Sequence, residues 1–237
     1  MEKLEQLYEG KAKKIYKTST PNVFWIEYKN SVTAFNGEKK DIIEGKGALN
    51  NKISSRIFKL LQSRGIDSHF VEQISDTEQL VKSVEIIPIE VIVRNIVAGS
   101  MSKRLGIKEG TPLEKPIVEF YYKNDDLNDP LITTSHIRVL GLADKNQLKT
   151  IKEIALTVND ILFGIFDEAD INLVDFKLEF GIDSMGNILL ADEISPDTCR
   201  LWNKSDNSKL DKDLYRRDLG DIVSAYEKVY NRLLEVK

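Results

Sequence analysis

The N-terminal part of the chain alternates short apolar runs with turn-forming residues. Residues 7–8, 14–17 and 23–28 are rich in β-branched and aromatic side chains, and the turn-forming segments 9–10 and 20–22 separate them. Runs of this kind between turns are typical of strands joined as hairpins. The pattern therefore predicts a small antiparallel sheet at the start of the fold.

Long helices are predicted where apolar positions recur every three or four residues. The first spans residues 50–64, ends at Gly65 and is expected to pack on the N-terminal sheet. The second spans residues 145–168, with an apolar stripe along one face. A terminal helix is predicted from the apolar positions Leu219, Ile222, Val223, Tyr226, Val229, Tyr230 and Leu233.

Further strands are predicted through the middle and the end of the chain. They are expected at residues 69–74, 86–93, 117–122, 171–180 and 188–193. The last two are separated by a turn at residues 183–187 and predict a β-hairpin. A short helix is expected at residues 99–105, and residues 108–130 are expected to form loops around a single strand.

The order of these elements predicts the fold class. Strands come first, and mixed strands and long helices follow, which is typical of an α+β protein. We expect two lobes: residues 1–85 as a β-rich lobe with an antiparallel sheet, and residues 86–237 as a larger lobe of mixed helices and strands.

Composition narrows the class of protein. The chain has 237 residues, of which 41% are hydrophobic, and a formal net charge of -4, which argues against a protein that coats nucleic acid or an anionic membrane. A single cysteine, Cys199, excludes an intramolecular disulfide and fits a reducing cytoplasm. No segment has the pattern of a secretion signal or a membrane-spanning helix, so we expect a cytoplasmic protein with no membrane partner.

The segment LVDFKLEFG, residues 173–181, carries the strongest chemical signal. Strand alternation places Asp175, Lys177 and Glu179 on one face, and Asp192 follows on the returning strand of the hairpin. Neighbouring carboxylates repel, and a hard divalent cation such as Mg²⁺ would relieve that repulsion while binding phosphate oxygens. The alternative is a solvated hairpin in which Lys177 bridges its acidic neighbours.

The turn EGKAKK, residues 9–14, offers a candidate phosphate site. It combines a glycine, backbone N–H groups and three lysines between two predicted strands, which suits a loop that covers a polyphosphate. It does not match the pattern GxxxxGK[ST], and a lysine-bearing turn at the surface is the alternative.

Arginines in two separate segments offer a second anion site. Arg94 lies in the apolar segment IIPIEVIVRNIVAGS, residues 86–100, which ends in Gly99-Ser100, and Arg200 ends the loop DEISPDTCR. Paired guanidinium donors with a Gly-Ser turn suit a phosphate group. The alternative for Arg94 is a buried ion pair with Glu90.

The cysteine and the histidines give no comparable signal. Cys199 has no sequence-visible histidine partner, so it is expected to be a packed thiol. His69 and His136 are interpreted as structural or surface residues.

Taken together, the motifs resemble the SAICAR synthetase (phosphoribosylaminoimidazole-succinocarboxamide synthase) family of de novo purine biosynthesis. The resemblance runs over nearly the whole chain and includes LYEGKAKKIY, NNKISSRIFKLL, GSMSKRLGI, KNDDLNDP, DEISPDTCRLW and the two segments IIPIEVIVRNIVAGS and LVDFKLEFG. It implies an architecture related to ATP-grasp and kinase-like folds, with an ATP site between a nucleotide-covering N-terminal lobe and a C-terminal lobe that binds substrate and metal.

The resemblance also implies a reaction. Enzymes of this family join the carboxylate of carboxyaminoimidazole ribotide (CAIR) to the amine of L-aspartate and convert ATP into ADP and phosphate. An amine does not displace oxide from a carboxylate, so we expect ATP to form an acyl phosphate first. The protein then has to position the reactants and neutralise charge.

Site residues follow from the resemblance position by position. Nucleotide contacts are implied for Gly10, Lys11, Ala12, Lys13, Val81, Lys82 and Val84. Substrate contacts are implied for Glu90, Arg94, Ser100, Lys177 and Arg200. Magnesium ligands are implied at Glu179, Asp192 and Asp129, and catalytic roles at Lys177, Asp175 and Lys13.

One position departs from the family pattern, because Asn36 stands where many relatives carry Asp. A neutral amide is a poorer magnesium ligand, although it can still hydrogen-bond to a substrate. The resemblance further implies a homodimer.

Two other classes of protein are weighed against this one. A kinase would share a β-rich lobe and a metal-binding segment, but Asp175-Phe176-Lys177 is not DFG and no HRDxxxxN loop occurs. A nucleotide- or RNA-binding regulator would need a basic stripe or stacking aromatic side chains, which the sequence does not show.

Overall fold

The N-terminal strands form an antiparallel sheet, as the sequence predicts, and two later strands, one of them not predicted, extend it to five. The computed structural model describes residues 1–34 and 37–236. The sheet has the strand order β1 (Lys3–Glu9), β2 (Lys13–Thr18), β3 (Val23–Tyr28), β7 (Glu78–Lys82), β6 (Phe70–Gln73). A separate two-stranded ribbon follows, formed by β4 (Ser31–Ala34) and β5 (Lys39–Ile42).

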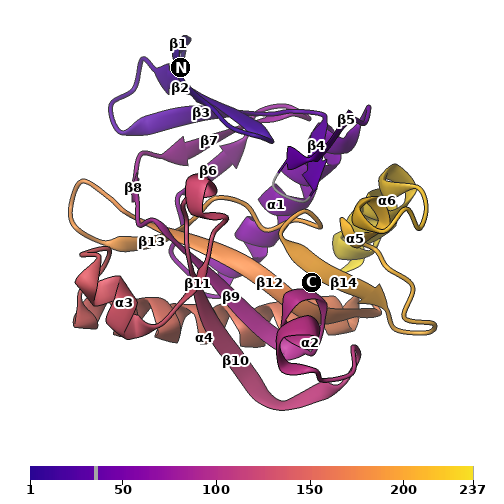
Figure 1. Cartoon of the computed structure of the whole chain (residues 1–237). Helices are drawn as coiled ribbons and strands as arrows, with labels where there is room; N and C mark the ends of the chain where they lie inside the picture. The colour runs from indigo at the N-terminus through magenta and orange to yellow at the C-terminus, as the bar shows by residue number, and fades with distance from the viewer. Residues whose placement is uncertain (35–36, 237) are drawn as a thin grey trace.

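A larger antiparallel sheet lies below the first in the view of Figure 1. Its main path is β11 (Leu131–Ile132), β10 (Pro112–Tyr122), β9 (Ile89–Ile96), β12 (Ile171–Ile182), β13 (Ile188–Ala191). Two further strands, β8 (Glu85–Ile86) and β14 (Cys199–Asn203), also pair with β12. Strand β12, which contains the LVDFKLEFG segment, is therefore the central strand of this sheet.

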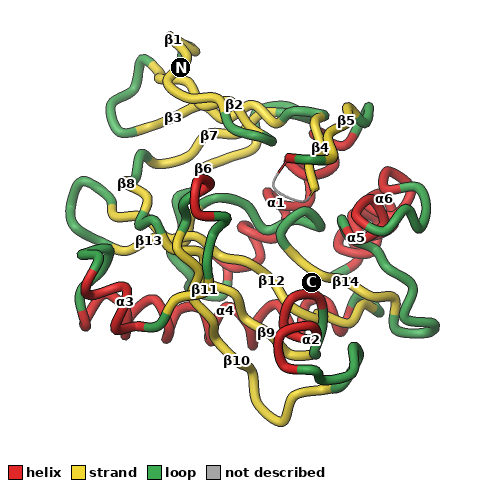
Figure 2. Tube along the Cα trace, viewed as in Figure 1, coloured by secondary structure: helices red, strands yellow, loops and turns green. Residues whose placement is uncertain are grey.

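Helices cover the larger sheet and join it to the first (Figures 1 and 2). They are α1 (Lys46–Ser63), α2 (Gly99–Leu105), α3 (Thr134–Val139), α4 (Lys145–Glu168), α5 (Asp213–Arg216) and α6 (Ile222–Glu235), with a 3₁₀-helix at Asp125–Leu127. Helix α4 packs along β9, β10 and β12, and α1 packs against α6. The amphipathic stripe in residues 145–168 is thus the face that the sheet buries.

One continuous hydrophobic core ties these layers together. It includes Phe58 of α1, Phe166 of α4, Phe176 of β12 and Tyr226 of α6, all of them fully buried. The N-terminal sheet has only a small cluster of its own around Ile26, Tyr28 and Val81. The α+β class with two lobes is confirmed. The boundary between residues 85 and 86 stays a prediction. Helix α1 precedes that boundary in the chain, yet its apolar side chains belong to the main core.

The structure corrects the prediction for residues 108–130. An eleven-residue strand, β10, runs from Pro112 to Tyr122, where loops around a shorter strand were expected. Its first half is largely exposed and contains two prolines, Pro112 and Pro116, and its pairing with β9 is irregular between Pro112 and Ile117. Proline within a run argues against a strand in a sequence, although an exposed or irregular stretch of a strand can contain it.

The structure also gives a finding on membrane spanning. Across residues 1–34 and 37–236, no helix is both long enough and apolar enough to cross a bilayer.

Candidate active site

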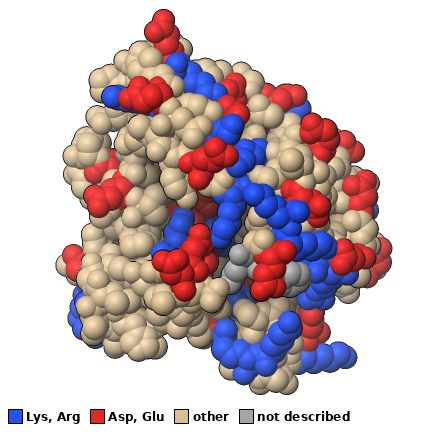
Figure 3. Space-filling view, turned by 45° about the horizontal axis from the view of Figure 1, so that its top comes forward, with Lys and Arg blue, Asp and Glu red and all other residues tan. Residues whose placement is uncertain are grey.

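A cavity of about 690 Å³ opens between the two sheets, a size within the usual range of small-molecule sites. Charged side chains of both signs gather around a recess on the face shown in Figure 3. One wall of the cavity is apolar and is formed by Ile15, Phe24, Ile26, Val81, Val84, Ile86 and Pro88. The remaining wall is strongly charged.

The structure brings the predicted nucleotide-binding residues together on this cavity. Its lining includes Gly10, Lys11, Ala12, Lys13, Val81, Lys82 and Val84. The turn after β1 is tied to the opposite lobe, because Lys11 Nζ lies 2.8 Å from Asp125 Oδ1. Position 36, whose role the sequence left open, lies outside the described residues.

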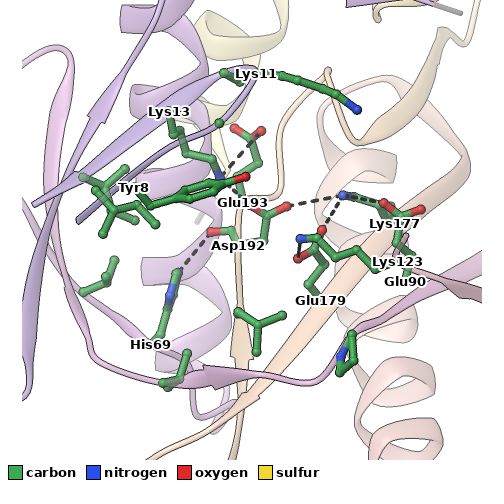
Figure 4. Close-up of a pocket in the computed structure, with 18 of the residues that line it drawn as sticks. Tyr8, Lys11, Lys13, His69, Glu90, Lys123, Lys177, Glu179, Asp192 and Glu193 are labelled. Carbon is green, nitrogen blue, oxygen red and sulfur yellow. Dashed lines mark hydrogen bonds and ion pairs between the residues drawn. The ribbon is translucent and has the colours of Figure 1, made fainter. Parts of the chain in front are cut away.

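Lys13 and Asp192 form an ion pair at the centre of the charged wall (Figure 4). Lys13 Nζ also lies 3.8 Å from Glu193 Oε1. Burial alone would raise the pKa of Asp192, but the charges of Lys13 and Lys177 outweigh it and hold that pKa well below its usual range. Asp192 follows Ala191, the residue paired with Glu179, and has a left-handed φ of 59°.

Lys177 contacts three carboxylates on the same wall. Its Nζ lies 2.6 Å from Glu179 Oε1, 3.0 Å from Glu90 Oε1 and 3.5 Å from Asp192 Oδ2. Glu179 also pairs with Lys123. Burial would lower the pKa of Lys177, but these carboxylates raise it well above its usual value, so the ammonium keeps its charge. Lys177 thus bridges its acidic neighbours, but in a pocket wall rather than on a solvated hairpin.

The predicted magnesium ligands line this cavity as well. Glu179, Asp192 and Asp129 are all on its wall, and Asp129 Oδ1 accepts a 2.8 Å hydrogen bond from the backbone N–H of Asn124. Carboxylate oxygens are the ligands that Mg²⁺ prefers. However, the described part of the chain contains no group of three or more His, Cys, Asp or Glu side chains arranged to hold a metal ion.

His69, interpreted from the sequence as structural or surface, lines the cavity. It is 3% exposed, and its Nε2 lies 3.0 Å from the carbonyl oxygen of Asp192. Burial, and then the charge of Lys13, lower its pKa from 6.5 to about 4, so the ring is neutral and donates this hydrogen bond. In the sequence, a lone histidine at the start of the predicted strand 69–74 gives no signal of a position on a cavity.

A second cavity, of about 370 Å³, adjoins the first. The two share Ala12, Glu90, Lys177 and Glu193. The predicted substrate residues all lie on the wall of this smaller cavity, namely Glu90, Arg94, Ser100, Lys177 and Arg200.

Asp175 organises the two arginines of the smaller cavity. Its carboxylate lies 2.5 Å from Arg94 Nη1 and 2.9 Å from Arg200 Nη1. Arg94 Nη2 donates a 3.3 Å hydrogen bond to Ser100 Oγ. A Cβ at Gly99, whose φ is +54°, would lie 2.5 Å from Arg200 Nη2, so the Gly-Ser turn must begin with glycine. The alternative, a Glu90–Arg94 ion pair, does not form between these described residues, because Glu90 pairs with Lys177 and Arg94 pairs with Asp175 and Glu119.

Asp213 supports the same cavity from behind and was missed in the sequence. It is 2% exposed, and it accepts hydrogen bonds from Arg200 Nε at 3.2 Å and from Arg216 Nη1 at 2.7 Å. Cys199 is buried, and burial raises the pKa of its thiol well above the usual range, which fits the packed thiol that the sequence predicts.

The fold and the paired cavities define the class: a two-lobed α+β enzyme whose cleft suits a nucleotide beside a phosphorylated small molecule. Comparison with known families identifies which one. The family model for SAICAR synthetase matches residues 6–233, and the chain therefore belongs to the SAICAR synthetase family.

Individual relatives agree with this assignment over nearly the full chain. The phosphoribosylaminoimidazole-succinocarboxamide synthase of Bacillus subtilis is 64% identical, over 98% of this chain and 96% of the relative. The crystal structure of the enzyme of that name from Ehrlichia chaffeensis has a TM-score of 0.95 at 48% identity, covering 98% of this chain and 100% of the other. A SAICAR synthetase in complex with ADP has a TM-score of 0.94 at 48% identity, covering 98% and 99%.

The neutral, buried His69 predicts a pH-dependent contribution to stability. Its folded-state pKa of about 4 lies below the ordinary 6.5, so the contribution is complete above pH 6.5 and is lost as the pH falls toward 4. Urea unfolding at pH 7 and pH 4.5 should show that wild type loses about 2 to 3 kcal/mol more than His69→Gln over this interval. The exposed His136→Gln is the control and should follow wild type. Equal losses in wild type and His69→Gln would contradict the prediction.

Proposed function

We propose that this enzyme joins the carboxylate of CAIR to the amine of L-aspartate with the use of ATP, giving SAICAR, ADP and phosphate. Family membership supports the reaction class. The observation that carries the proposal is the meeting of two cavities at Lys177: one has an apolar wall and a lysine-bearing turn, and the other has paired arginines. A nucleotide and a phosphorylated substrate would face each other across this lysine.

The larger cavity is the proposed nucleotide site. The adenine would lie against the apolar wall near Val81, Lys82 and Val84, and the turn from Gly10 to Lys13 would hold the phosphates. The ADP complex of the related synthetase supports nucleotide binding by this fold. Backbone N–H groups and ammonium groups are the donors that phosphate oxygens require.

Magnesium fits the donor chemistry of the same wall. Glu179 and Asp192 would hold the ion, with Asp129 as a further ligand, because all three present hard carboxylate oxygens to the cavity. When bound, the ion would neutralise charge on the nucleotide phosphates. Glu179 already pairs with Lys123 and Lys177, and Asp192 pairs with Lys13, so both carboxylates lie where a positive charge is favourable.

The chemistry is proposed to pass through an acyl phosphate of CAIR. A carboxylate oxygen attacks the γ-phosphorus of ATP and ADP leaves; the amine of L-aspartate then forms the C–N bond, and phosphate departs. Lys177 and Lys13 would stabilise the negative charge on the transferred group, since both ammonium groups stay protonated in their carboxylate surroundings. Asp175 touches the two arginines, so we propose a positioning role for it.

The ribotide phosphate is proposed to lie in the smaller cavity. Arg94 and Arg200 are fixed by Asp175, and Ser100 adds a hydroxyl beside them. Guanidinium groups held in place in this way lose little conformational freedom when a phosphate binds. Glu90, which pairs with Lys177, would contact the substrate where the two cavities meet.

An ADP-release assay tests the reaction class. With ATP and Mg²⁺ present, release should require both CAIR and L-aspartate, and omission of either should reduce it to background. Full ADP release without any amine would instead favour a kinase and contradict the proposed ligation.

The metal assignment predicts the behaviour of Glu179→Gln. Because an amide is a poorer ligand than a carboxylate, the variant should need at least about tenfold more Mg²⁺ for half-maximal activity. Calorimetry should show weaker Mg²⁺-dependent binding of ADP. Glu114→Gln, an exposed change on β10, is the matched control. Wild-type Mg²⁺ dependence in Glu179→Gln would remove Glu179 from the metal site.

The phosphate assignment predicts that Arg94→Ala weakens CAIR binding by about 1.5 to 3 kcal/mol, the usual contribution of a charged hydrogen bond. Calorimetry with CAIR measures the change, and ADP affinity should stay unaltered. Arg104→Ala is the control, because Arg104 shares the partner Glu119 but lies outside both cavities. Unchanged CAIR affinity in Arg94→Ala would exclude Arg94 from the phosphate site.

A further inference from the structure

Lys212 is a cation on the smaller cavity whose charge is not matched by a neighbouring carboxylate. It lies directly before α5 and lines the cavity wall. Asp197 lines the same cavity and its charge acts on Lys212, but it is already occupied, because its Oδ2 pairs with Lys46 and its Oδ1 accepts a 2.6 Å hydrogen bond from Tyr226. Among the residues that the structure describes, no carboxylate lies within 4.0 Å of Lys212 Nζ.

Arg216 lies beside Lys212 on the same wall and has donors to spare. Within residues 1–34 and 37–236, its guanidinium makes one hydrogen bond, from Nη1 to Asp213 Oδ1 at 2.7 Å. The remaining N–H groups of this rigid fork are therefore available to a ligand. Asp213 fixes the side chain in place, as it does for Arg200.

Lys212 and Arg216 differ from the other cations on the cavity in how fully neighbouring carboxylates pair with them. Arg94 and Arg200 share Asp175, and Lys177 is surrounded by carboxylates. Burial lowers the pKa of Lys212, and the nearby Asp197 opposes this effect only in part. A partly desolvated ammonium without a paired carboxylate is stabilised by a bound anion.

Lys212 shares the smaller cavity with the residues that join it to the larger one. Lys177 and Glu193 line both cavities, and Lys212 lies with them on the wall of the smaller one. The charge of Glu193 also acts on Lys212, as do those of Asp197, Lys46 and Arg216. A ligand bound by Lys212 would therefore lie in a cavity that Lys177 also lines.

Glu193 adds the opposite charge. It is 5% exposed, and its Oε2 has no hydrogen-bond partner among the described residues. A buried carboxylate oxygen without a partner is unfavourable unless a ligand or water supplies a donor. Lys212 and Arg216 have hydrogen-bond donors free for a ligand, and Glu193 has a free acceptor. Together they match a molecule that carries two carboxylates and one ammonium group.

We propose that Lys212 and Arg216 bind the carboxylates of a dicarboxylic α-amino acid, with Glu193 facing its ammonium group. The inference rests on the proposed ligation and assigns its amino-acid substrate a place: the smaller cavity, whose wall includes Lys177. Selection of a second carboxylate would explain why a short acidic amino acid is used in preference to a neutral one.

Steady-state kinetics of the full-length Lys212→Met variant test the proposal. The KM for L-aspartate should rise about tenfold to a hundredfold, as expected for loss of a charged hydrogen bond, while the KM values for CAIR and ATP stay within about twofold of wild type. Succinate, a dicarboxylate without an amine, should inhibit wild type competitively against L-aspartate and inhibit the variant at least about tenfold less.

Matched variants separate a binding role from a structural one. Lys212→Arg keeps the charge and should recover most of the affinity for L-aspartate, and Arg216→Met should reproduce the selective rise in KM. Lys204→Met removes a lysine that pairs with Asp167 outside both cavities, and it should leave the kinetics unchanged. Calorimetry with CAIR shows whether each variant keeps an intact ribotide site.

Three outcomes would overturn the proposal. An unchanged KM for L-aspartate in Lys212→Met and Arg216→Met would exclude both side chains from the amino-acid site. A matching loss of CAIR affinity would assign them to the ribotide phosphate. Lys212→Arg behaving as poorly as Lys212→Met would show that charge is not what matters. Absence of turnover by wild type with CAIR and L-aspartate would instead reject the proposed function itself.

Discussion

The charged face of β12 can be buried only because each charge on it meets a partner on a neighbouring element. Asp175 lies between Arg94 and Arg200, and Lys177 contacts Glu179 as well as Glu90. Removing one partner from such a pair leaves an uncompensated charge in a desolvated setting, which is strongly destabilising. The charged side chains of β12 thus determine which oppositely charged residues must line both cavities.

Backbone geometry around the site follows from this constraint. Asp192 reaches the lysines from a left-handed conformation that an L-residue rarely adopts, and the neutral ring of His69 holds its carbonyl group. On the other side, Gly99 leaves the space that the Arg200 guanidinium fills. At Asp192, the conformational free energy is offset by the ion pairs that this carboxylate completes with Lys13 and Lys177.

The parts of the site that could be predicted from the sequence are those whose residues lie close together in the chain. Alternation within LVDFKLEFG correctly placed Asp175, Lys177 and Glu179 on one face, because a strand fixes that relation locally. The roles of Glu193, Lys212 and Asp213 arise from contacts between segments that no periodicity links. His69 is a structural residue, as the sequence analysis allows, but its place on the cavity depends in the same way on the packing of its segment beside Asp192. The first half of β10 is not predicted from the sequence, because Pro112 and Pro116 interrupt its pattern.

The distribution of charge also explains how two adjoining cavities differ in a protein of net charge -4. In the larger cavity, lysines and carboxylates neutralise one another, so the proposed Mg²⁺ and nucleotide phosphates would bind together by replacing existing pairs. In the smaller cavity, Asp175 is shared by two arginines, Arg216 pairs with Asp213 but keeps further N–H donors, and Lys212 has no carboxylate within 4.0 Å among the described residues. This arrangement favours ligands that carry several negative groups. Lys177 belongs to both walls, so the two patterns of charge meet at the position where we expect the bonds to change.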